Sequence, residues 1–212
     1  MCDRWALPIW TIMLVAVGIR TSAQDANARL RAELESIHEL DQRDRENAGS
    51  YPSGAQKDSV IAHMALQDSL DLVRVTAIID SAGWLGEKEI GHIANQALFL
   101  VIQHADAKPE IQAKYLPLMR DAVTDGNARS YELALLEDRV AVNHGRPQIY
   151  GSQIGWKDGK GFVKPMEDEE HADERRKAVG LEPLEKYAER FGINWSPPVQ
   201  KERVLLFEPP KH

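Results

Sequence analysis

The sequence contains a single cysteine, Cys2, which lies at the extreme N-terminus. One cysteine cannot form an internal disulfide, and the rest of the chain has no thiol for nucleophilic, redox or cysteine-type zinc chemistry. Basic residues are also in deficit, 26 against 33 acidic ones, which gives a net charge of −7. That balance argues against nucleic acid as a partner and against electrostatic adhesion to anionic lipid.

Several catalytic motifs are missing as well. The sequence has no G-x-S-x-G elbow, no glycine-rich phosphate loop, no H-E-x-x-H pair and no EF-hand loop. Serine-type nucleophilic catalysis and the best-known metal motifs are therefore not indicated. There is also no internal repeat that would indicate a solenoid.

The first 23 residues are typical of a cleavable export signal. Arg4 precedes a short apolar run at residues 6–19, and the small residues Thr21 and Ala23 precede the polar Gln24. The run is shorter than the roughly 20 apolar residues that span a bilayer. We therefore predict cleavage after Ala23, a periplasmic or secreted bacterial product, and no stable membrane association afterwards. An uncleaved N-terminal anchor is the alternative.

Apolar residues recur at helical spacing along most of the remaining chain. They predict helices at residues 25–47, 58–81, 87–104, 109–124, 128–143, 169–179 and 183–191. The second of these is apolar on nearly every side, so we expect it to be central. Residues 148–156 and 160–164 have strand character and flank Asp158-Gly159, a typical two-residue hairpin turn.

The predicted fold class is mainly α. After the signal at residues 1–23, residues 24–212 are expected to form a single bundle-like domain of about six to seven helices. One short β-hairpin is expected at about 148–164, and a proline-rich tail at about 195–212. An apolar patch in that tail, Val204–Phe207, is expected to dock against the body of the domain.

Several predicted helices carry a charged or titratable residue on their apolar side, given about 100° of rotation per residue. Burying such a group without a partner costs several kcal/mol, so these groups must meet one another. We predict in particular that Asp41, His104 and Arg139 lie in one buried pocket. The inward-facing set is Asp41, Arg45, Asp68, Asp71, His104, Arg139 and Arg176.

Short motifs spread over most of the chain resemble a bacterial family known only as domain of unknown function 6624. In chain order they are Asp41-Gln42, Gly83-Trp84-Leu85-Gly86, Gln103-His104-Ala105-Asp106, Leu136 to Arg139, Gly145 to Gln153, and Asp173 to Leu184. Each motif is weak alone, but their order and spacing together are specific. Leu85 stands where the family often has proline, and Asp71 where it often has asparagine. The family has no known activity, so the resemblance implies motif positions and no chemistry.

The residues favour general acid–base hydrolysis as the first enzymatic hypothesis. His104 is the candidate base, Asp41 or Asp106 would orient it, and Arg139 would hold an anionic group. The candidate ligand-binding residues are Gln42, Asp68, Gln103, Arg139, Gln148, Tyr150, Gln153 and Arg176.

A carboxylate–histidine metal site is a less favoured alternative. Asp41, Asp68, Asp71, His104 and Asp106 supply suitable ligand atoms, but they follow no recognised ligand spacing. We therefore expect neither a metal nor a cofactor. Two classes of function stay open: an exported enzyme or binder of a small polar ligand, and a non-enzymatic structural or interaction module whose ion-pair network only fixes the fold.

Overall fold

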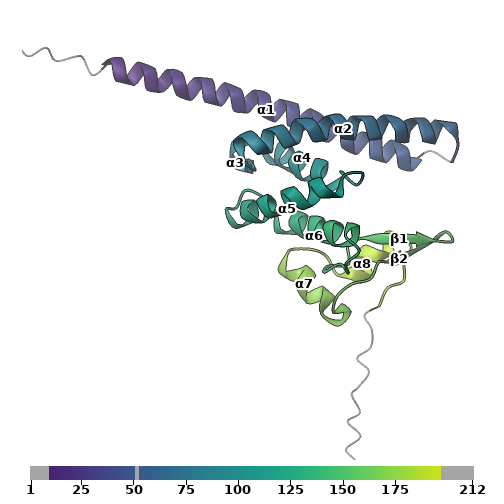
Figure 1. Ribbon diagram of the computed structural model, residues 1–212. Coiled ribbons are helices and arrows are strands. Elements are labelled where there is room, and N and C mark those ends of the chain that lie inside the picture. The colour runs from purple at the N-terminus through teal and green to yellow at the C-terminus, as the bar shows by residue number, and fades with distance from the viewer. Residues whose placement is uncertain (1–9, 51–52, 197–212) are drawn as a thin grey trace, which may run out of the picture. The chain divides into compact units, whose positions relative to one another are not determined.

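The computed structural model describes residues 10–50 and 53–196, and within them the chain is mainly helical. These residues form eight α-helices, one short 3-10 helix and one antiparallel two-stranded hairpin (Figure 1). The predicted fold class is therefore confirmed. The chain divides into two compact units, Met1–Arg129 and Ser130–His212. That the mature chain folds as a single domain stays a prediction, and the Val204–Phe207 patch lies outside the described residues.

The described residues of the first unit form five helices. They are α1 (Trp10–Ser50), α2 (Ala55–Ala82), α3 (Glu87–Ile90), α4 (His92–Gln103) and α5 (Pro109–Thr124). Helix α1 begins within the predicted export signal and continues past it without a break. It packs against both α2 and α4, and α4 packs against α5 (Figure 1). No helix in the described part of the chain is long and apolar enough to cross a membrane.

The buried helix of this unit is α4 rather than α2, so the expectation of a central second helix is wrong. Most of α4 is buried, whereas α2 buries one side only, with Leu72 and Val75 among its core residues. On the other side of α2, Leu66, Leu70 and Val73 are 57–66% exposed. The reason is that α2 packs on α1 and α4 along a single face, and its remaining apolar residues stay in solvent.

The predicted helix at 87–104 is interrupted at Gly91. This glycine has φ of 83° and separates α3 from α4. A Cβ at this position would lie 3.1 Å from the guanidinium carbon of Arg31 on α1, so the break also lets α1 approach closely. A helical period continues across the glycine in the sequence, and periodicity alone therefore did not reveal the break.

The second unit contains a short hairpin and three α-helices among its described residues. Its elements are α6 (Ser130–Asn143), β1 (Ile154–Lys157), β2 (Lys160–Val163), the 3-10 helix Glu169–His171, α7 (Ala172–Ala178) and α8 (Leu184–Glu189). Asp158 and Gly159 both have positive φ, 52° and 74°, as a tight primed turn requires. The predicted turn is therefore confirmed. The first strand starts later than predicted, because residues 148–153 form a loop in which Gly151 has φ of 75°.

Candidate functional site

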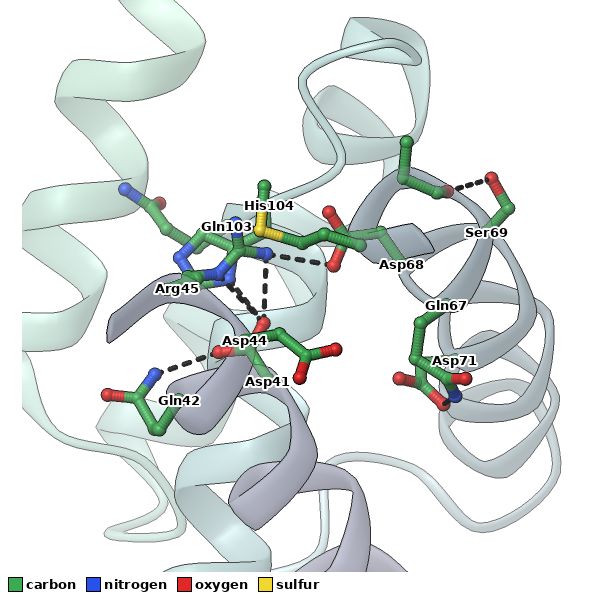
Figure 2. Close-up of polar contacts among 12 residues, drawn as sticks. Asp41, Gln42, Asp44, Arg45, Gln67, Asp68, Ser69, Asp71, Gln103 and His104 are labelled. Atoms are coloured by element: carbon green, nitrogen blue, oxygen red, sulfur yellow. Dashed lines mark hydrogen bonds and ion pairs between the residues drawn. The ribbon is translucent and has the colours of Figure 1, made fainter. Parts of the chain in front are cut away.

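The carboxylate of Asp41 is the centre of a polar cluster in the first unit. Its side chain is only 3% exposed. His104 Nδ1 hydrogen-bonds to Asp41 Oδ1 at 2.8 Å, and Arg45 Nε donates to the same oxygen at 3.0 Å. Gln42 Nε2 donates to Asp41 Oδ2 at 2.8 Å (Figure 2). The cluster thus joins α1 to His104, the residue directly after α4.

Arg45 extends the cluster to α2. Its Nη2 lies 2.9 Å from Asp41 Oδ1 and 2.9 Å from Asp68 Oδ1, so one guanidinium nitrogen bridges two carboxylates (Figure 2). Arg45 Nη1 lies 3.6 Å from the sulfur of Met64. Arg45 and Asp68 side chains are each 27% exposed. The bridge therefore lies where the buried cluster reaches solvent.

The two carboxylates that Arg45 joins differ in acidity. Burial acts to raise the pKa of Asp41, but the hydrogen bonds and charges of His104 and Arg45 hold that pKa well below its usual value. Burial raises the pKa of Asp68 above its usual value, and Arg45 offsets only part of the effect. The pKa of Asp71 is also raised, by burial and then by the nearby charges of Asp68 and Asp41. Asp41 is therefore held as the anion, while Asp68 is the carboxyl that takes up a proton more readily.

A pocket of about 260 Å³ opens beside this cluster. Its lining residues are Arg45, Met64, Ala65, Asp68, Ser69, Leu72, His104, Ala105, Asp106, Ala107 and Lys108. The imidazole of His104 is 18% exposed and uses Nδ1 for the bond to Asp41, so Nε2 is the ring nitrogen available to a ligand. The pocket thus combines an oriented histidine, a carboxyl of raised pKa and an apolar wall.

The other candidates in the first unit lie close to this pocket. Asp106 is exposed on its rim, and its Oδ1 accepts a hydrogen bond from Gln112 Nε2 at 3.3 Å. Gln103 is buried, and its backbone oxygen accepts from the same Gln112 amide at 2.9 Å. Of the two carboxylates proposed to orient His104, Asp41 makes the hydrogen bond to its ring. Across the described residues, no three His, Cys, Asp or Glu side chains are grouped so as to hold a metal ion.

The remaining predicted residues belong to the second unit. Arg139 lies on α6 and is partly buried. Because it belongs to a different unit from Asp41 and His104, its place in a shared pocket stays a prediction.

Gln148, Tyr150, Gln153 and Arg176 all lie in or against the loop at residues 148–153. Gln148 Nε2 donates to the backbone oxygens of Gln153 and Lys164, and its Oε1 accepts from the Gln153 amide at 2.7 Å. Arg176 is 1% exposed and donates to the backbone oxygens of Glu182 and Tyr150, at 2.6 and 2.7 Å. Burial lowers the pKa of Arg176. Gln148 and Arg176 therefore hold the backbone of the loop in place. The side chains of Tyr150 and Gln153 instead donate to side chains, to Glu137 Oε2 at 3.4 Å and to Ser152 Oγ at 3.0 Å.

Two residues that matter in these clusters were absent from the predicted site. The helical spacing of Arg45 predicts an inward-facing side chain, but spacing alone does not indicate that it bridges Asp41 and Asp68. Asp138 is fully buried, and its carboxylate accepts three backbone N–H groups of the loop, from Ile149, Tyr150 and Ser152, at 2.6–2.9 Å. Its signal in the sequence was its helical spacing with two small buried residues of α6, Ala134 and Ala141.

Comparison with known proteins gives a family but no activity. No curated protein and no solved structure matches the chain. A family profile, described as a family of unknown function, matches residues 28–194, which include every element from most of α1 to α8. The chain therefore belongs to the family of unknown function DUF6624.

Proposed function

We propose that the pocket beside Asp41 and His104 binds a small polar ligand and that His104 acts there as a general base. The observation that carries the proposal is the 2.8 Å hydrogen bond between a buried aspartate and a histidine that lines a pocket. An aspartate on one ring nitrogen fixes the tautomer and orientation of the imidazole, and it stabilises the imidazolium that forms when the other nitrogen takes a proton.

The proposed chemistry is hydrolysis by acid–base catalysis. With its proton on Nδ1, neutral His104 presents Nε2 as an acceptor, which takes a proton from a water molecule as the oxygen attacks the substrate. Asp68 lines the same pocket and burial raises its pKa, so we assign to its protonated form the donation of a proton to the leaving group. The imidazolium proton then returns to Asp68 through solvent. Arg45 keeps Asp41 ionised throughout this cycle.

The competing function is structural. Asp41 already accepts hydrogen bonds from three side chains, so the cluster would also serve to fix α1, α2 and the end of α4 relative to one another. The two readings differ in one respect that can be measured. A structural cluster affects stability alone, whereas a functional one affects ligand binding or turnover with the fold intact.

A second histidine–aspartate pair provides a matched control. His171 Nδ1 lies 2.8 Å from Asp168 Oδ1, the same separation as in the proposed site, but both side chains are about half exposed. The pair does not line the pocket described above. His171→Gln therefore removes the same kind of contact at a position where we expect no catalytic effect.

The experiment begins with a thermal-shift screen of the purified protein against sugars and peptidoglycan fragments, with chromogenic ester, phosphoester and glycoside substrates assayed in parallel. A ligand that binds only the folded state raises the melting temperature by mass action. We expect His104→Gln to abolish turnover or to weaken binding at least tenfold, because general base catalysis contributes about 10²–10⁴-fold. His171→Gln should behave as the wild type. A screen without hits, or hits unaffected by His104→Gln, would contradict the proposal.

We also propose that the protein works outside the cytoplasm. The support is the sequence of residues 1–23, with a positive start, a short apolar run and small residues before Gln24. Intact-mass measurement of the protein recovered from the periplasm or the medium tests this directly. A mass that begins at Gln24 supports the proposal, and a mass that retains residues 1–23 overturns it.

A further inference from the structure

The side of α2 that faces away from α1 and α4 carries a row of exposed apolar side chains. Leu66, Leu70 and Val73 are 57–66% exposed, and Ala77, also exposed, continues the row. The spacing of four, three and four residues keeps them on one side of the helix, as in the seam of a coiled coil. With the polar residues at its two ends, the α2 seam consists of His63, Leu66, Leu70, Val73, Ala77 and Asp80. We propose that the α2 seam binds the α2 seam of a second copy of the chain, with the two helices antiparallel.

The side of α2 that carries the seam is poor in charge. Among the exposed residues from 59 to 79, Arg74 is the only lysine, arginine, aspartate or glutamate, and its Nη2 donates to Glu33 Oε2 on α1 at 2.7 Å. Beside the seam, Ala62 and Ser69 are small and exposed, so a second helix can approach closely. The exposed side of α1 carries, by contrast, the charged residues Arg31, Glu39 and Arg43. The seam therefore has the composition of a helix–helix interface rather than of a solvent-facing side.

The sizes of the apolar side chains fit one antiparallel register. In this register Leu66 of each copy lies opposite Ala77 of the other, and Leu70 lies opposite Val73. Each leucine thus meets a smaller side chain, which allows the two rows to interdigitate at the close spacing of packed helices.

The polar ends of the seam fit the same register. His63 of each copy then lies opposite Asp80 of the other, and both side chains are more than half exposed. Asp80 already accepts hydrogen bonds from Lys114 and Tyr115, at 3.1 and 2.8 Å. An ionised carboxylate has about four acceptor sites, so it can accept one more bond, from an imidazole N–H. The dimer therefore gains a complementary polar contact at each end.

Other arrangements of the two helices fit less well. A parallel pair sets Asp80 against Asp80, where like charges repel. An antiparallel pair shifted by one heptad sets His63 against Val73, which offers the ring no hydrogen-bond partner. In the proposed arrangement both copies use the same surface, so the assembly closes as a dimer.

The length of the seam determines how stable such a dimer is. From His63 to Asp80 the helix spans about 26 Å at 1.5 Å per residue. We expect a helix pair of that length to bury roughly 1,000 Å² in total, at the small end of specific interfaces. The dimer should therefore be reversible and form at micromolar concentrations of the chain.

Sedimentation velocity of the purified full chain, at about 2–500 µM, provides the first test, because that range covers a micromolar Kd. We expect the mass to rise with concentration from one chain to two. Leu70→Glu should raise the Kd at least tenfold, because each copy then brings a charge into the apolar seam. Trp156→Glu is the matched control: Trp156, on β1, is 62% exposed, and its substitution should leave the Kd unchanged.

Disulfide cross-linking tests the antiparallel register. All variants carry Cys2→Ser, which removes the native thiol. The double variant Leu66→Cys, Ala77→Cys should form covalent dimers on oxidation, because the two positions face each other across the pair. Within one chain they lie about 16 Å apart along the helix, too far for a disulfide. Leu66→Cys alone should not cross-link, since the two copies of position 66 are separated by a similar distance.

The proposal fails if the wild type stays monomeric over the whole concentration range, or if Leu70→Glu associates as tightly as the wild type. It also fails if Leu66→Cys alone cross-links as readily as the double variant, which would indicate a different arrangement. Leu70 is exposed and glutamate favours helices, so Leu70→Glu stays folded and keeps the test decisive. The dimer does not depend on the function proposed for the pocket, so His104→Gln should leave the Kd of dimerisation unchanged.

Discussion

The Arg45 bridge allows a paired comparison of two aspartates that make the same contact. Asp41 and Asp68 each lie 2.9 Å from Arg45 Nη2, yet the pKa of Asp41 is lowered and the pKa of Asp68 is raised. A lowered native pKa means that ionised Asp41 stabilises the fold above its unfolded pKa of about 3.9, and that this is lost as the pH falls. A raised native pKa means that protonated Asp68 stabilises the fold below about pH 3.9, and that this stabilisation is lost as the pH rises through the native pKa.

The magnitude for Asp41→Asn follows from its hydrogen bonds. Oδ1 of Asp41 accepts three contacts, one from His104 and two from Arg45. An asparagine oxygen can still accept them, but without the negative charge each bond weakens by about 1 kcal/mol. We therefore expect Asp41→Asn to lower the free energy of unfolding by about 3 kcal/mol at pH 7. Asp68→Asn keeps an acceptor for Arg45 and removes a charge that burial disfavours. We therefore expect this substitution to leave the free energy of unfolding unchanged or to raise it slightly.

Urea denaturation at pH 7, followed by circular dichroism, measures both changes if the m-values of the variants match the wild type. The difference in stability between Asp41→Asn and the wild type should narrow as the pH is lowered towards 3, because the unfolded wild-type chain then takes up a proton at Asp41 while the native carboxylate, with its lowered pKa, stays ionised. A loss below about 1 kcal/mol for Asp41→Asn, or an equal loss for Asp68→Asn, would refute the assignment of these charges.

The second unit yields two further predictions. Asp138→Ala leaves three backbone N–H groups without an acceptor and should lower the free energy of unfolding by at least about 3 kcal/mol. We expect a lower urea midpoint and faster hydrogen exchange of those three amides. Unchanged exchange would show that the carboxylate does not hold the loop. Gly151→Ala should destabilise more than Gly145→Ala, although both glycines have positive φ, because only the Cβ at 151 would lie 2.7 Å from Leu184. Equal losses of melting temperature would contradict the steric part of that argument.

Local chemistry determined which parts of the fold could be predicted. Helix α5 was predicted with its observed bounds, because Pro109 suits a first helical turn and Asp125-Gly126 ends the helix. The hairpin turn was equally well marked by Asp158-Gly159. The role of α2 was not predictable in this way, because a helix that is apolar on every side does not indicate which side will be covered. That choice depends on how α1 and α4 pack, which is set by contacts far apart in the sequence.

The candidate site, like the fold, could be predicted from the sequence only in part. Helical spacing placed Asp41 and His104 on inward faces, and the two side chains do meet. The periodicity could not distinguish a polar group that faces a pocket from one that binds its own backbone. Gln148 and Arg176 are of the second kind, since their donors reach backbone oxygens of the loop and its surroundings. A side-chain amide or guanidinium has the same appearance in the sequence in either role.

The contact between Asp41 and His104 also has a kinetic consequence, because it joins residues 63 positions apart in the chain. Bringing distant segments together costs loop-closure entropy, and a directional hydrogen bond between them requires the helices to be already in place. We therefore expect this contact to form after the folding transition state, with a φ-value near zero. Asp41→Asn should then speed unfolding and leave the folding rate almost unchanged. The polar cluster would thus set how long the native state persists rather than how quickly it is reached.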